Sequence, residues 1–180
     1  LACQGWLLGA HLRLARRVDR DPLTGLPGRA RLVDRAGRAL SSGQGVGLVF
    51  VDLDRFKEVN DSHGHVVGDR VLAEVARRLQ RAAGPDAFVA RYGGDEFAVL
   101  VTVRAAETEG LADRIGRCLR SPVLAPAPVD VSASIGAANG AGGTVDDLLV
   151  AADAAMYAAK RAVTGMRTTV PNAETAIAAP

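Results

Sequence analysis

The near-continuous apolar run from Val46 to Leu53, which includes several β-branched valines, constrains the fold more than any other feature. A strand with one face in water alternates apolar and polar residues, whereas this run is apolar at successive positions. We therefore predict a strand that is buried on both faces. The expected fold class is α/β, an α+β sandwich in which a mixed central β-sheet is covered by helices.

Patterns before and after this run supply the remaining elements. Asp21-Pro22 ends an N-terminal helix, because proline disfavours the helical conformation of the preceding residue. Gly93-Gly94 is typical of a tight hairpin, and Thr144 with Asp147 is typical of a capping box at a helix start. The sequence predicts helices at 27–40, 66–83, 105–120 and from 144 onward, strands at 87–92, 97–103 and 129–137, and a polar loop at 54–65.

The charge of the chain argues against one broad class of function. Lys and Arg number 22 and Asp and Glu 20 among 180 residues, so the formal net charge is only +2. A general nucleic-acid binder usually shows a strong basic excess, so we expect no nucleic-acid partner. Cys3 and Cys118 are far apart and in no metal-binding or redox spacing, which favours reduced thiols in a cytoplasmic protein.

The chain begins at Leu1 within an apolar pattern, so we expect a fragment of a longer protein. Residues 1–20 are predicted to form a linker or stalk helix with a short heptad-like stripe, namely Leu7, His11, Leu14 and Val18. The alternative is the last turn of a membrane anchor, because the arginines at 13, 16 and 17 fit a cytoplasmic flank. Residues 168–180 lack a pattern and are expected to be disordered.

Two acidic clusters stand at the ends of predicted strands. Asp52 and Asp54 end the buried run, and Asp95 and Glu96 follow the hairpin glycines. Charged groups at the end of a core strand are costly unless they are paired or bound to a metal. If the strands are neighbours, the carboxylates converge and suit a hard cation such as Mg²⁺, which serves phosphoryl transfer. For the first cluster alone, a simple polar strand end explains the pattern equally well.

The residues after Asp52 suit a nucleotide. Lys57 can reach phosphate oxygens, and backbone N–H groups in such a turn can form an anion-binding concavity. The carboxylate of Asp69 can accept both donors of the guanine edge, and the Asn60 amide can serve its acceptors. Alone, Lys57 is more simply a surface lysine, and Asp69 can also cap a helix. His63 and His65 form a conceivable zinc pair, but packing of the loop is the better interpretation.

Four ordered blocks then resemble a known family, the GGDEF domains or diguanylate cyclases. Arg91–Phe97 (RYGGDEF) resembles the family's signature, and Phe50–Asp69 (FVDLDRFKEVNDSHGHVVGD) its nucleotide-binding stretch. The opening motif is similar to Asp21–Arg29 (DPLTGLPGR). The C-terminal part is similar to Ser132–Gly136 (SASIG) and Ala152–Lys160 (ADAAMYAAK).

The resemblance implies a nucleotide-cyclase or palm-like fold over residues 21–167 and a role for each matched residue. Mg²⁺, or Mn²⁺, would be bound by the side chains of Asp52 and Asp95 and the carbonyl of Leu53. Asp95, Glu96 and Lys57 would act in catalysis. The substrate would be bound by Asn60 and Asp69 at guanine, by Phe56, Lys57 and Lys160 at the phosphates, and by His65.

The resemblance also implies the reaction and the partners. Two GTP molecules would be condensed into cyclic di-GMP and two pyrophosphates in bacterial second-messenger signalling. Each domain holds one guanine site and the product contains two guanines, so two GGDEF domains would act as a homodimer. An upstream sensor domain would control them, in a cytoplasmic enzyme whose full-length form is compatible with a membrane anchor. Retention of Asp69 favours GTP over ATP.

Three features depart from the family's pattern. Gly28 stands where the opening motif usually has Asn, and we expect a mild effect. Gly84 and Ala87 stand where the inhibitory product site has Arg and Asp, so we predict no product feedback there. The C-terminal motif is two residues longer than usual, which makes a phosphate contact by Arg167 doubtful. The alternatives to an active cyclase are a non-catalytic nucleotide-binding module and a dimerisation scaffold.

Overall fold

The computed structural model describes residues 20–102, 105–141 and 143–161. The predicted stalk, apart from Arg20, and the predicted tail lie outside these residues, as does Arg167. No helix in these three stretches is long and apolar enough to cross a membrane.

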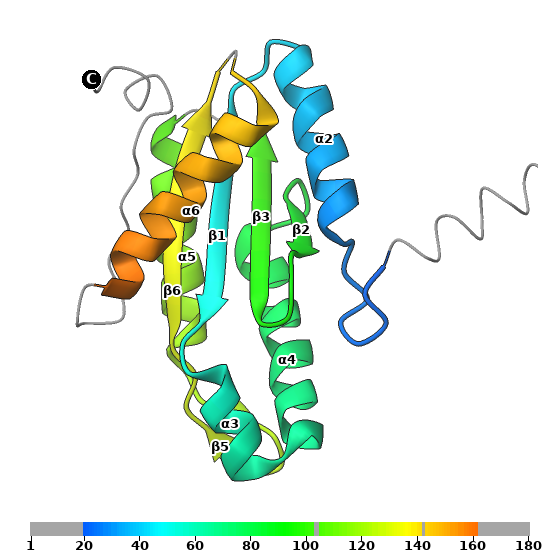
Figure 1. Cartoon of the computed structure of the whole chain (residues 1–180), viewed down its shortest axis with the longest axis vertical. Helices are drawn as coiled ribbons and strands as arrows, with labels where there is room; N and C mark the ends of the chain where they lie inside the picture. The colour runs from blue at the N-terminus through cyan, green and yellow to red at the C-terminus, as the bar shows by residue number, and fades with distance from the viewer. Residues whose placement is uncertain (1–19, 103–104, 142, 162–180) are drawn as a thin grey trace, which may run out of the picture.

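The core of the domain is a four-stranded sheet in the order β2-β3-β1-β6 (Figure 1). Its strands are β1 (Val46–Leu53), β2 (Phe88–Arg91), β3 (Glu96–Thr102) and β6 (Ala133–Gly140). All eight residues of β1 are buried, as the apolar run predicted. The expected sandwich class is therefore confirmed. Each pairing among these four strands is antiparallel, without the parallel pairs that a mixed sheet includes.

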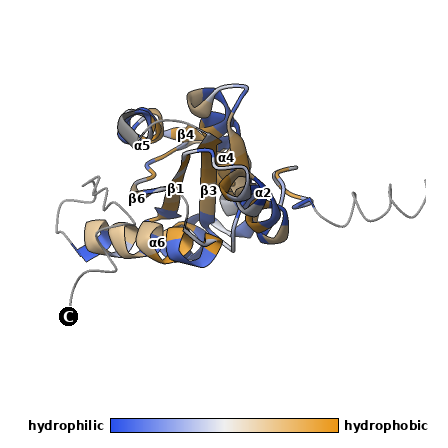
Figure 2. Ribbon diagram, turned by 90° about the horizontal axis from the view of Figure 1, so that it is seen from above, coloured by the Kyte–Doolittle hydropathy of each residue, from blue (hydrophilic) through white to orange (hydrophobic). Residues whose placement is uncertain are grey.

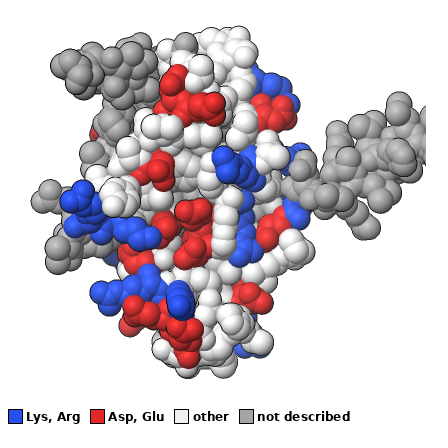
Figure 3. All heavy atoms as spheres, viewed as in Figure 1, with Lys and Arg blue, Asp and Glu red and all other residues white. Residues whose placement is uncertain are grey.

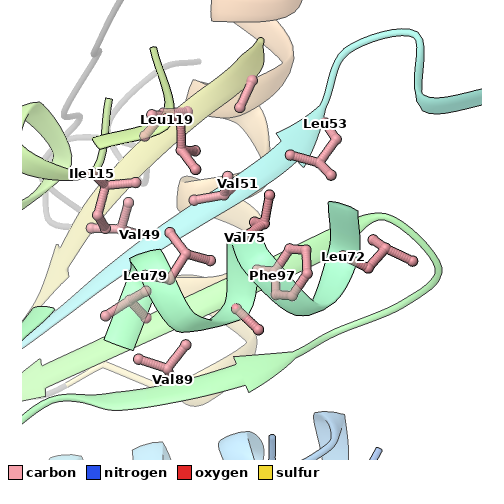
Figure 4. Packing of buried hydrophobic residues seen from close by; sticks show 14 of the residues in the cluster. Val49, Val51, Leu53, Leu72, Val75, Leu79, Val89, Phe97, Ile115 and Leu119 are labelled. Atoms are coloured by element: carbon pink, nitrogen blue, oxygen red, sulfur yellow. The ribbon is translucent and has the colours of Figure 1, made fainter. Parts of the chain in front are cut away.

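Helices cover both faces of the sheet (Figure 2). On one face, α4 (His65–Ala83) and α5 (Ala105–Leu119) pack on Val49, Val51 and Leu53 of β1 (Figure 4). On the other face, α2 (Arg29–Ser41) and α6 (Val145–Arg161) pack on Leu48 and Phe50. Successive side chains of a strand point to opposite faces. Both sets must be apolar here, which explains why β1 shows no alternation.

Two stretches differ from the sequence prediction. The polar loop expected at 54–65 is largely a helix, α3 (Phe56–His63), which the pattern missed because none of its residues is buried. Gly64, with φ of 82°, separates α3 from α4, and this left-handed region favours glycine. The strand expected at 129–137 is divided between β6 and β5 (Pro128–Val129), which pairs with β4 (Val123–Leu124).

The predicted capping box at the start of α6 is confirmed. The backbone N–H of Asp147 donates to Thr144 Oγ1 at 3.2 Å, and the N–H of Thr144 donates to Asp147 Oδ2 at 3.1 Å. These bonds satisfy N–H groups that a helix start otherwise leaves without an intrahelical partner. Gly136 of β6 lets α6 lie close to the sheet, because a Cβ at this glycine would be 2.6 Å from Met156 Cα.

Candidate active site

The two predicted acidic clusters meet at one end of the sheet. Asp52 of β1 lies directly opposite Glu96 of β3 in the antiparallel register. The backbone N–H of Leu53 also donates to the carbonyl of Asp95 at 3.3 Å. Asp52 is buried, whereas Asp95 and Glu96 are partly exposed. The pairing of β1 with β3 therefore brings together carboxylates that are more than forty positions apart in sequence.

Lys160 reaches this cluster from the last turn of α6. Its Nζ donates to Asp52 Oδ1 at 2.8 Å. This hydrogen bond is the largest cause that raises the pKa of Lys160, and the carboxylates of Asp54 and Asp95 add to it. The lysine expected at the phosphates therefore holds the buried carboxylate of Asp52 in this structure. A hydroxyl–carboxylate hydrogen bond, in which Ser134 Oγ donates to Asp54 Oδ1 at 2.7 Å, joins β6 to the residue that follows β1.

Glu96 carries the strongest sign of crowded negative charge. Burial is the largest cause that raises its pKa, and the charges of Asp52, Asp95 and Asp153 raise it further. Asp153 of α6 was missed in the sequence, although its distance of seven positions from Lys160 places both on one helix face. On the face drawn in Figure 3, acidic side chains gather near the middle of the molecule with basic side chains on either side.

The hairpin loop that carries Asp95 is tightly held. The N–H of Tyr92 donates to the carbonyl of Glu96 at 2.8 Å. Arg91 donates through Nε and Nη2 to the carbonyl of Gly94, at 3.0 and 2.6 Å. A Cβ at Gly93 would lie 2.8 Å from Glu96 Oε2, so a larger residue there would displace the end of this side chain, whereas the space around Gly94 is open.

The predicted guanine-reading pair lies on α3 and the start of α4. The Asn60 side chain lies against Gly68, where a Cβ would overlap its Oδ1, and Asp69 follows directly. The absence of a side chain at Gly68 therefore lets the Asn60 amide lie against the first turns of α4, next to the position of Asp69 in the chain. Asp69 is exposed at the surface, and so is His65 at the start of α4. An exposed Asp69 is free to meet a base that enters from solvent.

The turn from β1 into α3 has an unusual backbone. Arg55 adopts a left-handed conformation with φ of 53°, which is uncommon for a residue other than glycine. Phe56 and Lys57 then form the first turn of α3, where N–H groups have no intrahelical acceptor. Lys57 is exposed. This turn therefore presents N–H groups and a lysine beside the acidic cluster.

The donor set fits a hard cation. Among the described residues, no group of three or more His, Cys, Asp or Glu side chains is arranged to hold a metal, which also leaves the zinc alternative for His63 and His65 without support. The set expected for Mg²⁺ is smaller, namely the carboxylates of Asp52 and Asp95 and the Leu53 carbonyl. All of these donors are oxygens, as Mg²⁺ prefers. Burial raises the pKa of Glu96 most, and the charges of Asp52 and Asp95 add to it; such a cation would offset these charges.

The departures from the family pattern lie outside this cluster. Gly28 is the N-cap of α2 with φ of −88°, and no atom lies within 4 Å of a Cβ built there, so nothing at this position requires glycine. Gly84, with φ of 86°, ends α4. Arg81, the nearest arginine to it, points its guanidinium toward Glu74 at 3.4 Å.

Comparison with known proteins agrees with this geometry. The family described as "Diguanylate cyclase, GGDEF domain" matches residues 18–166. The diguanylate cyclase TpbB of Pseudomonas aeruginosa is 38% identical over 174 residues, which cover 91% of this chain and 40% of TpbB. The first curated relatives are much longer, and the chain spans between 21% and 40% of their length.

Two solved structures share the fold. The GGDEF domain of TpbB from Pseudomonas aeruginosa superposes with a TM-score of 0.77 at 39% identity, covering 86% of this chain and 94% of that one. The coiled coil and GGDEF domain of DgcB from Caulobacter crescentus, in complex with c-di-GMP, gives 0.81 at 30% identity, covering 94% and 95%.

The fold and the acidic strand ends define a palm-like domain of the nucleotide-cyclase type. Within that class, the chain belongs to the GGDEF domain family, the diguanylate cyclases.

Proposed function

We propose that this domain is a Mg²⁺-dependent diguanylate cyclase, which joins two GTP molecules into cyclic di-GMP and releases two pyrophosphates. The observation that carries the proposal is the junction of β1 with β3, where Asp52 lies opposite Glu96 and beside Asp95. Carboxylates that crowd at the end of a core strand are costly by themselves. A cation-dependent phosphoryl-transfer site accounts for their presence.

The proposed cation ligands are the side chains of Asp52 and Asp95 and the carbonyl of Leu53, with Glu96 in support. When bound, Mg²⁺ or Mn²⁺ would neutralise phosphate charge and polarise the phosphorus–oxygen bonds. The first turn of α3, with Phe56 and Lys57, is proposed to hold phosphate oxygens through backbone N–H groups and the ammonium.

The base would be read by Asn60 and Asp69, with His65 nearby at the start of α4. The Asp69 carboxylate can accept both the N1–H and the N2–H₂ of guanine. Adenine lacks this donor pair, so it would leave the carboxylate without partners and bind less well. The contact of the Asn60 side chain with Gly68, the residue before Asp69, supports the pairing.

The chemistry needs two domains. The 3′-hydroxyl of one GTP loses its proton to Asp95, and the oxygen attacks the α-phosphorus of the other GTP. The bond to the pyrophosphate leaving group then breaks. The reciprocal attack closes the ring, so each domain supplies one nucleotide and the active species is a homodimer. The position of Asp95 beside the end of β1, where its carbonyl accepts from the Leu53 N–H, supports a proton acceptor at this site.

We further propose that the usual product-inhibition site is lacking, because Gly84 and Ala87 provide neither the guanidinium nor the carboxylate that it needs. Tight binding of cyclic di-GMP to the isolated domain in isothermal titration would contradict this. DgcB of Caulobacter crescentus was solved in complex with c-di-GMP.

The chain spans less than half the length of its longer relatives. We therefore also propose a sensor domain upstream of this domain. The enzyme would act on GTP in the cytoplasm.

The test is to incubate the domain with Mg²⁺ and GTP over a range of protein concentrations and to separate the nucleotides by chromatography. Cyclic di-GMP is expected, with a rate that rises more than linearly with concentration because the active species is a dimer. Asp95→Asn is expected to abolish the product. Asp34→Asn is the matched control, because this exposed carboxylate on α2 pairs with Arg38 across one helical turn.

The outcomes separate the competing functions. GTP that raises the melting temperature without forming product would favour a non-catalytic nucleotide-binding module. A domain that neither binds nor converts GTP at high concentration would favour a scaffold. Equal activity of the wild type and Asp95→Asn would contradict the proposed site.

A further inference from the structure

Lys160 contacts the least exposed carboxylate of the site. Its Nζ lies 2.8 Å from Asp52 Oδ1, and the two side chains are 48% and 11% exposed, respectively. Asp52 lies near the end of β1, the strand that is paired on both sides by β3 and β6. Lys160 lies in the last turn of α6 and carries a flexible four-carbon stem. The lysine is therefore the partner that is able to move.

The charges around Lys160 show what it offsets. The carboxylates of Asp52, Asp54 and Asp95 raise its pKa, which keeps it protonated at neutral pH. In turn, its positive charge acts against the rise in the pKa of Glu96. The ammonium thus balances part of the negative charge that the proposed divalent cation would balance. It does so at the oxygen of Asp52, which is a proposed ligand.

Two cations are not expected to share this oxygen closely, because like charges a few ångströms apart repel strongly in a partly buried site. We infer that Lys160 is the resting counter-ion of Asp52 and must leave when a divalent cation binds. Its release would then make the ammonium available to phosphate. The inference rests on the proposed function and adds an order of events to it, in which arrival of the cation prepares the site for the nucleotide.

The test measures cation binding without nucleotide, by electron paramagnetic resonance titration of Mn²⁺. Lys160→Met keeps the length of the stem and removes the charge, so Mn²⁺ affinity is expected to rise on the order of fivefold. Lys160→Arg keeps the charge and is expected to restore wild-type affinity. Arg161→Gln removes a neighbouring positive charge, and the Arg161 guanidinium lies over the ring of Tyr157. This variant controls for the general change in electrostatic field and is expected to change Mn²⁺ affinity less than about twofold.

The melting temperature gives a second readout. Without Lys160, the buried Asp52 loses its partner, so Lys160→Met is expected to melt at a lower temperature than the wild type in EDTA. Addition of Mn²⁺ is expected to raise the melting temperature of Lys160→Met more than that of the wild type. If Lys160→Met lowers stability but leaves Mn²⁺ affinity unchanged or weaker, the counter-ion role is overturned. If none of the proteins binds Mn²⁺, the cation site of the proposed function fails, and this inference fails with it.

Discussion

Arg91 joins Asp21, before the start of α2, to the hairpin loop that carries Asp95. Its Nη1 lies 2.8 Å from Asp21 Oδ2, while Nε and Nη2 both donate to the carbonyl of Gly94. The backbone N–H of Arg91 also donates to the carbonyl of Pro27 at 2.9 Å. One side chain therefore joins two segments that are 70 positions apart. The orientation of the loop before Asp95 depends on this contact.

The first prediction concerns Arg91→Lys. A lysine has one point charge and no planar fork, so it cannot hold Asp21 and the Gly94 carbonyl together. We expect a loss of about 1–3 kcal/mol in the free energy of unfolding, since hydrogen bonds to charged groups are broken in a partly buried place. We also expect a fall in kcat of about tenfold or more, because small displacements of catalytic groups are costly.

Urea unfolding and steady-state kinetics measure these two effects. Arg38→Lys is the matched control, because Arg38 is exposed and pairs with Asp34 on the same helix. A variant with lowered stability but unchanged kcat would mean that the loop keeps its position without Arg91.

The second prediction is the pH dependence of the Asp21 contact. Burial acts to raise the pKa of Asp21, but hydrogen bonds from Thr24 and the ion pair with Arg91 outweigh it, so the pKa lies below its ordinary value of 3.8. A carboxyl whose pKa is lowered by folding adds stability above its unfolded pKa, about 4, and this stability is lost as pH falls through the folded value.

Asp21→Asn should therefore melt at a lower temperature than the wild type at neutral pH. The difference should shrink as the pH falls below about 4, where the wild-type carboxylate also becomes protonated. Circular dichroism melts of both proteins over a pH series measure this difference in melting temperature. A difference that stays constant through the acid range would show that the charge of Asp21 is not what stabilises the turn.

The third prediction concerns Glu96→Gln in the absence of metal. Burial first, and the carboxylates of Asp52 and Asp95 next, raise the pKa of Glu96. Above that pKa the ionised form opposes folding, so the amide is expected to raise the melting temperature by about 1–3 °C at pH above neutral. The gain should shrink as the pH falls through the folded and unfolded pKa values and disappear well below about pH 4, where the wild-type side chain is protonated in both states.

Cyclase activity should fall in the same variant, because active sites often retain groups that cost stability. Glu109→Gln on the exposed side of α5 is the control and is expected to change neither property. A lower melting temperature for Glu96→Gln would contradict the assigned repulsion.

The fourth prediction concerns the close approach of α6 to the sheet. A Cβ at Gly136 would overlap the backbone of Met156 and the carbonyl of Ala152. These atoms are backbone and cannot give way, so Gly136→Ala is expected to lower the free energy of unfolding by about 2–4 kcal/mol. Because α6 also carries Lys160, activity at low temperature should fall in the molecules that remain folded.

Gly110→Ala is the matched control. It lies within α5, where the nearest atom to a new Cβ is the end of the Arg114 side chain at 3.8 Å. This substitution is expected to raise the free energy of unfolding by about 0.5–1 kcal/mol, because alanine is a better helix former than glycine. Denaturant unfolding of both variants gives the comparison, and equal effects at the two glycines would exclude a packing cause at Gly136.

The local patterns of the sequence determined most of the elements. The apolar run of β1 predicted a strand buried on both faces, and the Thr144–Asp147 capping box predicted the start of α6. These patterns are reliable because burial on two faces and satisfaction of helix N–H groups depend on near neighbours. The short helix α3 escaped prediction because it has no buried residue, so it leaves no hydrophobic period to detect.

The sequence by itself also supplied the candidate groups of the proposed site, since Asp52, Asp95, Asn60 and Asp69 could be named from residue type and spacing. Only the tertiary structure decided their neighbours. Lys160 meets Asp52 across 108 positions, and Asp153 enters the cluster from the same helix. Such contacts follow from the order of strands and from the packing of α6 on β6. They depend on where whole elements lie in space, which no local pattern of residues encodes.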